Sequence, residues 1–198
     1  RCRGRASRGA GTAGVAVTEG RHLKGRAGQT GRAGRMDHSD EADRSSEIVG
    51  VWEVADEAAM IELGESVGRA LAGSSTVLLL VGDLGSGKTT FTKGVARALG
   101  IDAAEVLSPT YTLIHEYVGR SGATLLHVDL YRLDPEEVPA TGLEEELGRA
   151  GIKVVEWAER LPWEEPGALR IEFELLAGGG RRLSARRAAE AATGGEEG

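Results

Sequence analysis

The chain of 198 residues has the size of one ordinary domain, and its 40% hydrophobic content is enough for a hydrophobic core. No apolar stretch reaches the ~18 residues needed to cross a bilayer, so we expect no membrane association. The single cysteine, Cys2, excludes an intrachain disulfide framework and favours a reducing, cytoplasmic location, and the four histidines lack the spacing of a zinc site.

The net charge of −7 is distributed unevenly along the chain. Residues 1–35 carry nine basic side chains and one acidic side chain, whereas the remaining residues carry 15 basic and 30 acidic ones. An acidic body differs from the basic surface that nucleic-acid-binding domains present. If a nucleic acid takes part in the function, we expect another subunit to hold it.

Residues 1–46 are predicted to be disordered. Residues 1–35 consist largely of Arg, Gly and Ala without periodicity, and such a composition buries too little apolar surface to offset chain entropy. Three interpretations stay open: a translated upstream region with the true start at Met36, an Arg-rich organellar transit segment, or a basic nucleic-acid-binding tail. The first is favoured because an acidic sequence typical of a folded protein follows Met36 directly.

The folded region is predicted to begin with a short strand at residues 48–54, followed by a helix. Asp56 is a typical N-cap residue, and Gly73 ends the helical pattern. Between them, apolar side chains recur at helical spacing at Met60, Leu63, Val67 and Leu71. The helix is therefore expected to turn one apolar face toward a core.

Residues 82–89 read Gly-Asp-Leu-Gly-Ser-Gly-Lys-Thr, a complete G-x-x-x-x-G-K-[ST] phosphate-binding loop. A run of Thr, Val and Leu at residues 76–81 predicts a buried strand before the loop, and residues 89–99 predict a helix after it. In this context the loop directs backbone N–H groups at a phosphate. The alternative, a glycine-rich turn without a ligand, does not explain Lys88 and Thr89.

The rest of the chain predicts further strands, short helices and a hairpin. Strands are expected at residues 111–118, 124–130 and 152–157, short helices from Pro135 and from a capping box at Thr141, and a hairpin of residues 169–176 and 181–185. The early alternation of strands and helices indicates a mostly parallel sheet, and the hairpin indicates antiparallel strands at an edge. We therefore predict an α/β fold: a single domain over residues 47–187 with a P-loop NTPase-type mixed β-sheet flanked by helices, followed by a flexible tail at residues 188–198.

Each part of the phosphate-binding loop has an expected task. Backbone N–H groups of residues 84–90 are expected to surround the phosphates, Lys88 to reach the β- and γ-phosphate oxygens, and the Thr89 hydroxyl to bind Mg²⁺. Thr90 is placed either to contact the α-phosphate or simply to start the helix. The predicted nucleotide-binding residues of the loop are Gly82, Asp83, Leu84, Gly85, Ser86, Gly87, Lys88, Thr89 and Thr90.

Two acidic residues end predicted strands and are candidates for the Mg²⁺ site. Asp129 ends the run Leu-Leu-His-Val-Asp, and Glu156 ends the run Ile-Lys-Val-Val-Glu. For either one alone, a solvated acid at a strand end is the simple alternative. We expect one of the two to contact the metal and the other to orient the attacking water.

The signals for the γ-phosphate and for the base are weaker. Residues 108–110, Ser-Pro-Thr, fit a loop that senses the γ-phosphate and fit a strand-initiating turn equally well. The chain contains no asparagine, so it lacks the Asn-Lys-x-Asp element with which GTPases read guanine. ATP is therefore the expected nucleotide.

Five short motifs together are more specific than the phosphate-binding loop alone. They are residues 82–91, residues 108–113 (Ser-Pro-Thr-Tyr-Thr-Leu), residues 127–133 (His-Val-Asp-Leu-Tyr-Arg-Leu), residues 142–145 (Gly-Leu-Glu-Glu) and residues 155–157 (Val-Glu-Trp). In this order and spacing they closely resemble the TsaE (also called YjeE) family, the bacterial ATPases of tRNA threonylcarbamoyladenosine synthesis. The likeness covers roughly residues 48–185.

The resemblance implies an activity and partners. A protein of this kind would bind ATP and Mg²⁺ and hydrolyse ATP slowly in support of TsaB and TsaD. That pair transfers threonylcarbamoyl to N6 of adenosine 37 in tRNA, and the ATP cycle would reset the pair between turnovers. The tRNA would be contacted only indirectly, through these partners.

The resemblance also implies roles for particular residues. Glu156 would be the acid of the metal site, together with Thr89, and Asp129 would position metal or water, so that the two acids are the predicted catalytic residues. Thr110 would belong to a mobile loop over the phosphate. Trp157 would be a functional neighbour of Glu156 that helps to bind the nucleotide, with ordinary core packing as the alternative.

Two other functions remain as alternatives: a small-molecule kinase on the same fold, and a nucleotide-dependent binding module. A kinase usually needs a lid with several arginines to clamp the transferred phosphate, whereas residues 133–148 are rich in Glu. In a binding module, ATP would order a surface and hydrolysis would be incidental.

Overall fold

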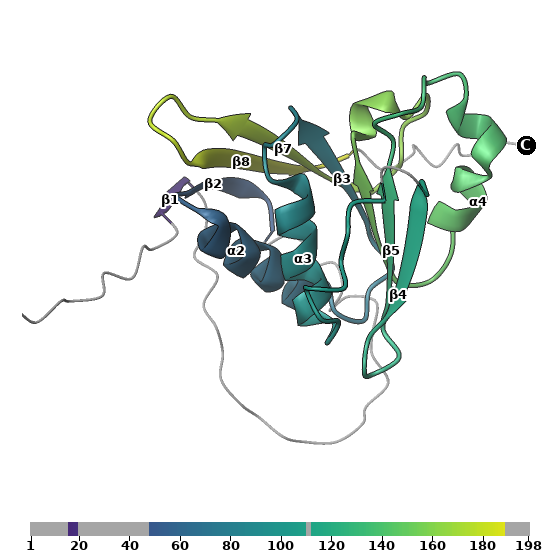
Figure 1. Cartoon of the computed structure of the whole chain (residues 1–198), viewed down its shortest axis with the longest axis horizontal. Helices are drawn as coiled ribbons and strands as arrows, with labels where there is room; N and C mark the ends of the chain where they lie inside the picture. The colour runs from purple at the N-terminus through teal and green to yellow at the C-terminus, as the bar shows by residue number, and fades with distance from the viewer. Residues whose placement is uncertain (1–15, 20–47, 110–111, 189–198) are drawn as a thin grey trace, which may run out of the picture.

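A mixed β-sheet with helices on both faces forms the body of the protein (Figure 1). The structure is a computed structural model that describes residues 16–19, 48–109 and 112–188. The strands of this part are β1 (Ala16–Glu19), β2 (Gly50–Val54), β3 (Val77–Gly82), β4 (Ile114–Val118), β5 (Thr124–Asp129), β6 (Ile152–Glu156), β7 (Leu169–Leu175) and β8 (Arg181–Arg187). The helices are α2 (Glu57–Ala70), α3 (Lys88–Ala98), α4 (Leu143–Leu147) and the 3₁₀ helices η1 (Val138–Thr141) and η2 (Ala158–Arg160).

The sheet has a parallel centre and antiparallel strands on both sides. The strand order is β1-β2-β8-β7-β3-β6-β5-β4. β3 runs parallel to both of its neighbours, β7 and β6, and β6 also pairs in parallel with β5. All outer pairings are antiparallel. The predicted mixed sheet is confirmed, but antiparallel strands lie at both edges, because the short turn between β4 and β5 joins only antiparallel neighbours.

Two hydrophobic cores form, one on each face of the sheet. On β5, Leu125 packs on the face covered by α2 and α3, and Leu126 packs on the opposite face, where α4 lies. On β6, Val154 and Val155 are divided between the faces in the same way. Because side chains alternate along a strand, His127 and Asp129 on β5 and Glu156 on β6 also point to the side covered by α2 and α3.

Helices α2 and α3 approach each other closely at two glycines. A Cβ atom on Gly64 would lie 2.2 Å from the carbonyl oxygen of Phe91, and a Cβ atom on Gly94 would lie 2.2 Å from the carbonyl oxygen of Ile61. The four apolar positions predicted for α2 are all buried: Met60, Leu63, Val67 and Leu71. This packing holds the first turn of α3 in place next to the sheet.

The predicted start of α2 is confirmed, whereas β4 starts later than predicted. Asp56 caps α2 as expected, since its carboxylate accepts a hydrogen bond from the Ala59 N–H at 2.9 Å. The strand predicted at residues 111–118 begins only at Ile114. Leu113 has φ 69, and this left-handed conformation interrupts extended backbone.

The chain termini lie mostly outside the described residues. Within the segment predicted to be disordered, Ala16–Glu19 form β1 against β2, so the prediction is wrong for these four residues. The rest of residues 1–46, and the tail beyond residue 188, lie outside the described part. No helix in the described part has both the length and the apolar character needed to cross a membrane.

The two short helices before β6 also differ from the prediction. No helix begins at Pro135; a 3₁₀ helix begins instead at Val138. A second proline follows at Pro139, and in an α-helix its ring would clash with the carbonyl of the residue four positions earlier. The N-cap of α4 is Gly142 and not Thr141, because the left-handed φ of 74 at this glycine separates η1 from α4.

Candidate nucleotide-binding site

The phosphate-binding loop connects the central strand β3 to helix α3. The helix begins at Lys88, and its N-cap, Gly87, has φ 106, a left-handed conformation that favours glycine. A Cβ atom at this position would also lie 3.0 Å from Met60 Cε. The Ser86 Oγ atom is buried and has no hydrogen-bond partner among the described residues. The free N–H groups at the start of α3 thus face the carboxyl edge of the sheet, where anions bind in such folds.

A cleft of about 270 Å³ lies over this loop. Its lining consists of Leu84, Gly85, Ser86, Gly87, Lys88, Thr89, Thr90, Ser108, Asp129, Tyr131, Glu156 and Trp157. The structure therefore brings together most of the predicted site residues from four separate segments. Gly82 and Asp83 lie outside the lining, and Thr110 lies outside the described residues.

Lys88 is buried next to the cleft. Its Nζ donates hydrogen bonds to the carbonyl oxygens of Gly82 at 2.6 Å and Asp83 at 3.0 Å, and it lies 4.0 Å from the ring centre of Trp157. Burial lowers the pKa of Lys88, and nearby carboxylates, Glu156 foremost, oppose that shift. Since these hydrogen-bond partners are uncharged, the positive charge of Lys88 remains available to an anionic ligand.

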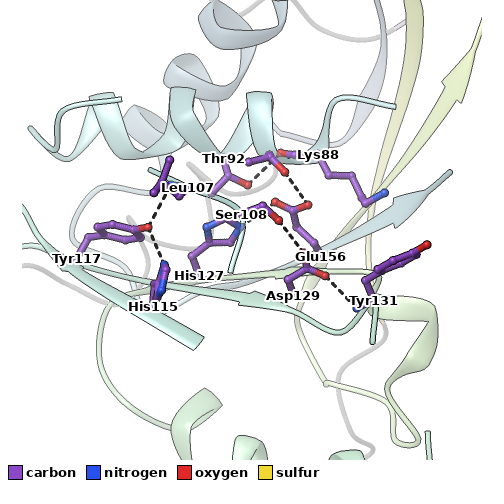
Figure 2. A network of polar contacts seen from close by, with 11 residues as sticks. Lys88, Thr92, Leu107, Ser108, His115, Tyr117, His127, Asp129, Tyr131 and Glu156 are labelled. Atoms are coloured by element: carbon purple, nitrogen blue, oxygen red, sulfur yellow. Dashed lines mark hydrogen bonds and ion pairs between the residues drawn. The ribbon is translucent and has the colours of Figure 1, made fainter. Parts of the chain in front are cut away.

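Glu156 connects the loop to the central strands (Figure 2). Its Oε2 accepts a hydrogen bond from Thr89 Oγ1 at 3.0 Å, and its Oε1 lies 2.7 Å from His127 Nε2. The side chain of His127 is 0% exposed and that of Glu156 is 3% exposed. A carboxylate at the end of β6 and the hydroxyl of the loop threonine are thus in direct contact.

Asp129 lies beside Glu156 in the parallel register of β5 and β6. Its Oδ2 accepts a hydrogen bond from Ser108 Oγ at 2.8 Å, and its Oδ1 accepts one from the Tyr131 N–H at 2.9 Å (Figure 2). Its backbone N–H donates to the carbonyl oxygen of Leu113 at 3.1 Å. Asp129, at the end of β5, is therefore hydrogen-bonded both to Ser108 and to Leu113, the two ends of one motif.

Trp157 follows Glu156 in an unusual conformation, with φ 59 and ψ 40. A left-handed backbone is uncommon for so bulky a side chain, and here it ends β6. The indole lines the cleft, and its ring centre lies 4.9 Å from that of Tyr131. It also packs against the core on the α4 side of the sheet. Trp157 thus takes part in core packing and also lines the cleft, and its role in binding the nucleotide stays a prediction.

Two residues of the site received no role from the sequence, and a third was left undecided. His127 and Tyr131 appeared only within a motif, and Ser108 fitted either a sensing loop or a turn. The usable signal was alternation on β5, which puts His127 on the same face as Asp129, two positions later. The contact of His127 with Glu156 depends on the neighbouring strand and has no signal in the local sequence.

The side chains of the cleft fit a Mg²⁺–triphosphate. Mg²⁺ prefers oxygen ligands and is usually held by one or two carboxylates together with phosphate and water. Thr89, Glu156 and the adjacent Asp129 offer such oxygens, and Lys88 with the loop N–H groups offers donors to phosphate. The described residues contain no group of three or more His, Cys, Asp or Glu suited to hold a metal by themselves.

Comparisons with known proteins point to one family. The model of the family described as threonylcarbamoyl adenosine biosynthesis protein TsaE matches residues 54–183. The tRNA threonylcarbamoyladenosine biosynthesis protein TsaE of a Nostoc species is 44% identical over 118 residues, which are 56% of this chain and 69% of the relative. The protein of the same name from Treponema pallidum is 42% identical over 123 residues, which are 61% of this chain and 88% of the relative.

A solved structure agrees with this assignment. The crystal structure of Bacillus subtilis YdiB aligns with a TM-score of 0.53 at 33% sequence identity, over 70% of this chain and 84% of that one. The region matched by the family model includes the phosphate-binding loop, both strand-end acids and Trp157. The chain therefore belongs to the TsaE family.

Proposed function

We propose that this protein binds ATP together with Mg²⁺ in the cleft and hydrolyses ATP slowly. The observation that carries the proposal is the 3.0 Å contact between the Thr89 hydroxyl and Glu156. In phosphate-loop NTPases, Mg²⁺ is held by the loop Ser or Thr and by an acid from a neighbouring strand. The preference for ATP rests on the absence of asparagine from the chain, and so of the guanine-reading element.

Each side chain of the site has a task in this proposal. Lys88 and the loop N–H groups bind the β- and γ-phosphates, and Thr89 with Glu156 holds the metal. Mg²⁺, when bound, neutralises charge that develops on the phosphate oxygens. Asp129 accepts a hydrogen bond from the attacking water and orients it toward the γ-phosphate. Thr110 lies outside the described residues, so its role in a loop over the phosphate stays a prediction.

The composition of the cleft supports slow turnover. Among the described residues that line it, Lys88 is the single cation. An arginine that stabilises the transition state contributes about 10³–10⁵ in rate in related NTPases. Because no arginine is among the described residues that line the cleft, the site is expected to hydrolyse ATP slowly on its own and to depend on partners for faster turnover.

We further propose that the ATP cycle supports N6-threonylcarbamoyladenosine formation in tRNA, together with TsaB and TsaD. Membership of the TsaE family supports the pathway. The chain after residue 35 carries 15 basic and 30 acidic side chains, which supports tRNA contact through the partners rather than directly. Leu84 and Tyr131 are 71% and 39% exposed beside the cleft and offer apolar surface to a partner. Because tRNA is the final substrate, we place this activity in the cytoplasm.

The test is Mg²⁺-dependent ATP hydrolysis by the purified protein, measured alone and then with TsaB, TsaD and tRNA. We expect slow turnover alone and faster turnover with the partners. Thr89→Ala should abolish the Mg²⁺-dependent rate, and Lys93→Ala, at a half-buried position of the same helix that does not line the cleft, should leave it unchanged. Rapid turnover that does not change when the partners are added would indicate a general NTPase and reject the role in tRNA modification.

The two alternative functions predict other outcomes. A kinase would release little ADP without an acceptor, because kinases exclude water from the transferred phosphate. The exposed side chains of Asp134, Glu136 and Glu137, which follow β5, disfavour a phosphate-clamping lid. A binding module would be indicated if Glu156→Gln abolished hydrolysis but left partner binding and tRNA modification intact.

A further inference from the structure

His127 is a fully buried polar side chain to which the proposed mechanism gives no task. Its Nε2 lies 2.7 Å from Glu156 Oε1, and the side chain is 0% exposed. Its Nδ1 is buried as well and has no hydrogen-bond partner among the described residues. The imidazole therefore makes one short hydrogen bond, and this bond is to the carboxylate proposed to hold the metal.

The unpartnered Nδ1 indicates which ring nitrogen carries the proton. A carboxylate oxygen accepts hydrogen bonds, so Nε2 is the donor in this contact. A proton on Nδ1 would leave a buried N–H donor without an acceptor, which costs more than a buried lone pair. The arrangement therefore corresponds to the tautomer with its proton on Nε2.

The register of the central strands explains why the two side chains meet. Asp129 pairs with Glu156 across β5 and β6, and His127 pairs with Val154. His127 and Glu156 are therefore diagonal neighbours on the face covered by α2 and α3, which is within reach of long side chains. Both are set in the backbone of buried strands, so their separation is held by the sheet.

We propose that His127 is a positioning residue that fixes the carboxylate of Glu156 for the metal. The hydrogen bond to Oε1 holds one carboxylate oxygen away from the cleft and leaves Oε2 beside the Thr89 hydroxyl. Without it, a glutamate side chain has three rotatable bonds, and a buried carboxylate oxygen would lack a donor. The effect on the metal rests on the proposed function, whereas the hydrogen bond itself does not.

The hydrogen bond is tested on the nucleotide-free protein by ¹⁵N and ¹H NMR of the histidine side chains. We expect one imidazole with a strongly downfield Nε2–H proton and an Nδ1 shift typical of an unprotonated nitrogen. His127→Gln removes and thereby assigns these signals, and Glu156→Ala should move the proton upfield. A proton on Nδ1, or no response to Glu156→Ala, would overturn the inference.

The positioning role is tested by calorimetric titration of a non-hydrolysable ATP analogue in EDTA and over a series of Mg²⁺ concentrations. His127→Leu should raise the Mg²⁺ concentration for half-maximal tightening by about tenfold or more, the usual effect of removing a partner of a metal ligand. Affinity in EDTA should stay within about twofold of the wild type, since weak binding without metal does not use Glu156. His127→Gln, whose amide N–H reaches the position of Nε2, should restore Mg²⁺ dependence.

Two controls make the outcome decisive. Thr92→Val removes a buried hydroxyl that donates to the Lys88 carbonyl at 3.0 Å, whereas the side-chain hydrogen bonds of Glu156 go to Thr89 and His127, so the substitution should leave the Mg²⁺ dependence unchanged. His127→Asn, which is too short to reach Glu156, replaces His127→Leu if the leucine variant does not fold. Equal loss of affinity with and without Mg²⁺, or no rescue by His127→Gln, would reject positioning. A wild type without any Mg²⁺ effect would reject the proposed metal site, and the positioning role with it, even if NMR confirmed the hydrogen bond.

Discussion

Replacement of Lys88 by Met separates binding of the phosphates from stability of the fold. Methionine keeps the length and apolar stem of the side chain and removes only the charged group. In the nucleotide-free protein, Nζ donates to two carbonyl oxygens, those of Gly82 and Asp83. Asp83 is exposed and Gly82 is half-buried, so water can replace the lost donor at both. The free energy of unfolding should therefore fall by no more than about 1 kcal/mol.

Nucleotide binding should respond far more strongly to the same substitution. A hydrogen bond from an ammonium group to a charged partner contributes about 1.5–3 kcal/mol. At about 1.4 kcal/mol per factor of ten, Lys88→Met should weaken binding of ATP by about tenfold to about 140-fold.

The assay is calorimetric titration of a non-hydrolysable ATP analogue at fixed Mg²⁺, combined with urea unfolding of the same samples. Lys93→Met, at a position of α3 that does not line the cleft, is the matched control and should bind as the wild type does. Wild-type affinity in Lys88→Met would refute the assignment of this loop to phosphate binding. A loss of affinity accompanied by an equally large loss of stability would show that Lys88 acts through the fold.

Further predictions concern stability. Gly94→Ala should lower the free energy of unfolding by about 1–3 kcal/mol in urea titrations, because its Cβ atom would lie 2.2 Å from the Ile61 carbonyl oxygen. Gly178→Ala, with open space around its Cβ position, is the control and should be close to neutral. An equal effect of the two substitutions would refute the close helix contact. Burial lowers the pKa of Lys153 below 10.5, so between its folded pKa and 10.5 the unfolded state binds more protons and the free energy of unfolding rises with pH. Urea midpoints measured from pH 8 to 11 should rise less in Lys153→Met than in the wild type. Identical pH profiles of the two proteins would contradict the shift. Deletion of residues 1–35 removes β1 from the edge of β2, whereas β2 keeps its pairing with β8. The melting temperature should therefore fall by less than about 4 °C. A larger drop would show that the segment contributes more than an edge strand.

The local sequence was sufficient to place the elements that surround the loop. The G-x-x-x-x-G-K-[ST] pattern, the apolar run before it and the spacing of Phe91, Val95 and Leu99 after it predict β3, the loop and α3, and these three apolar side chains are all buried. The local sequence also correctly predicted that Asp56 caps α2 and that β7 and β8 form a hairpin. Each of these signals depends on residues a few positions apart, which is the range over which caps, turns and periodicity act.

Where adjacent elements compete, the local sequence was less reliable. Two prolines at positions 135 and 139 each favour a helix start, and together they exclude an α-helix between them. The left-handed residues Leu113 and Trp157 end or delay strands that an apolar pattern alone would extend. Such outcomes depend on how the flanking segments pack, because an unfavourable backbone conformation persists only where its surroundings stabilise it.

By itself, the sequence determined that this protein has a phosphate-binding loop between a buried strand and a helix, and that two acids end nearby strands. Only the tertiary structure decided that β3 lies between β7 and β6, that Asp129 stands in register with Glu156, and that His127 Nε2 lies within hydrogen-bond distance of Glu156. The physical reason is that alternation along a strand specifies which face a side chain takes. Strand order and register, in contrast, are set by contacts between segments far apart in the chain, and it is these contacts that bring Glu156 to Thr89.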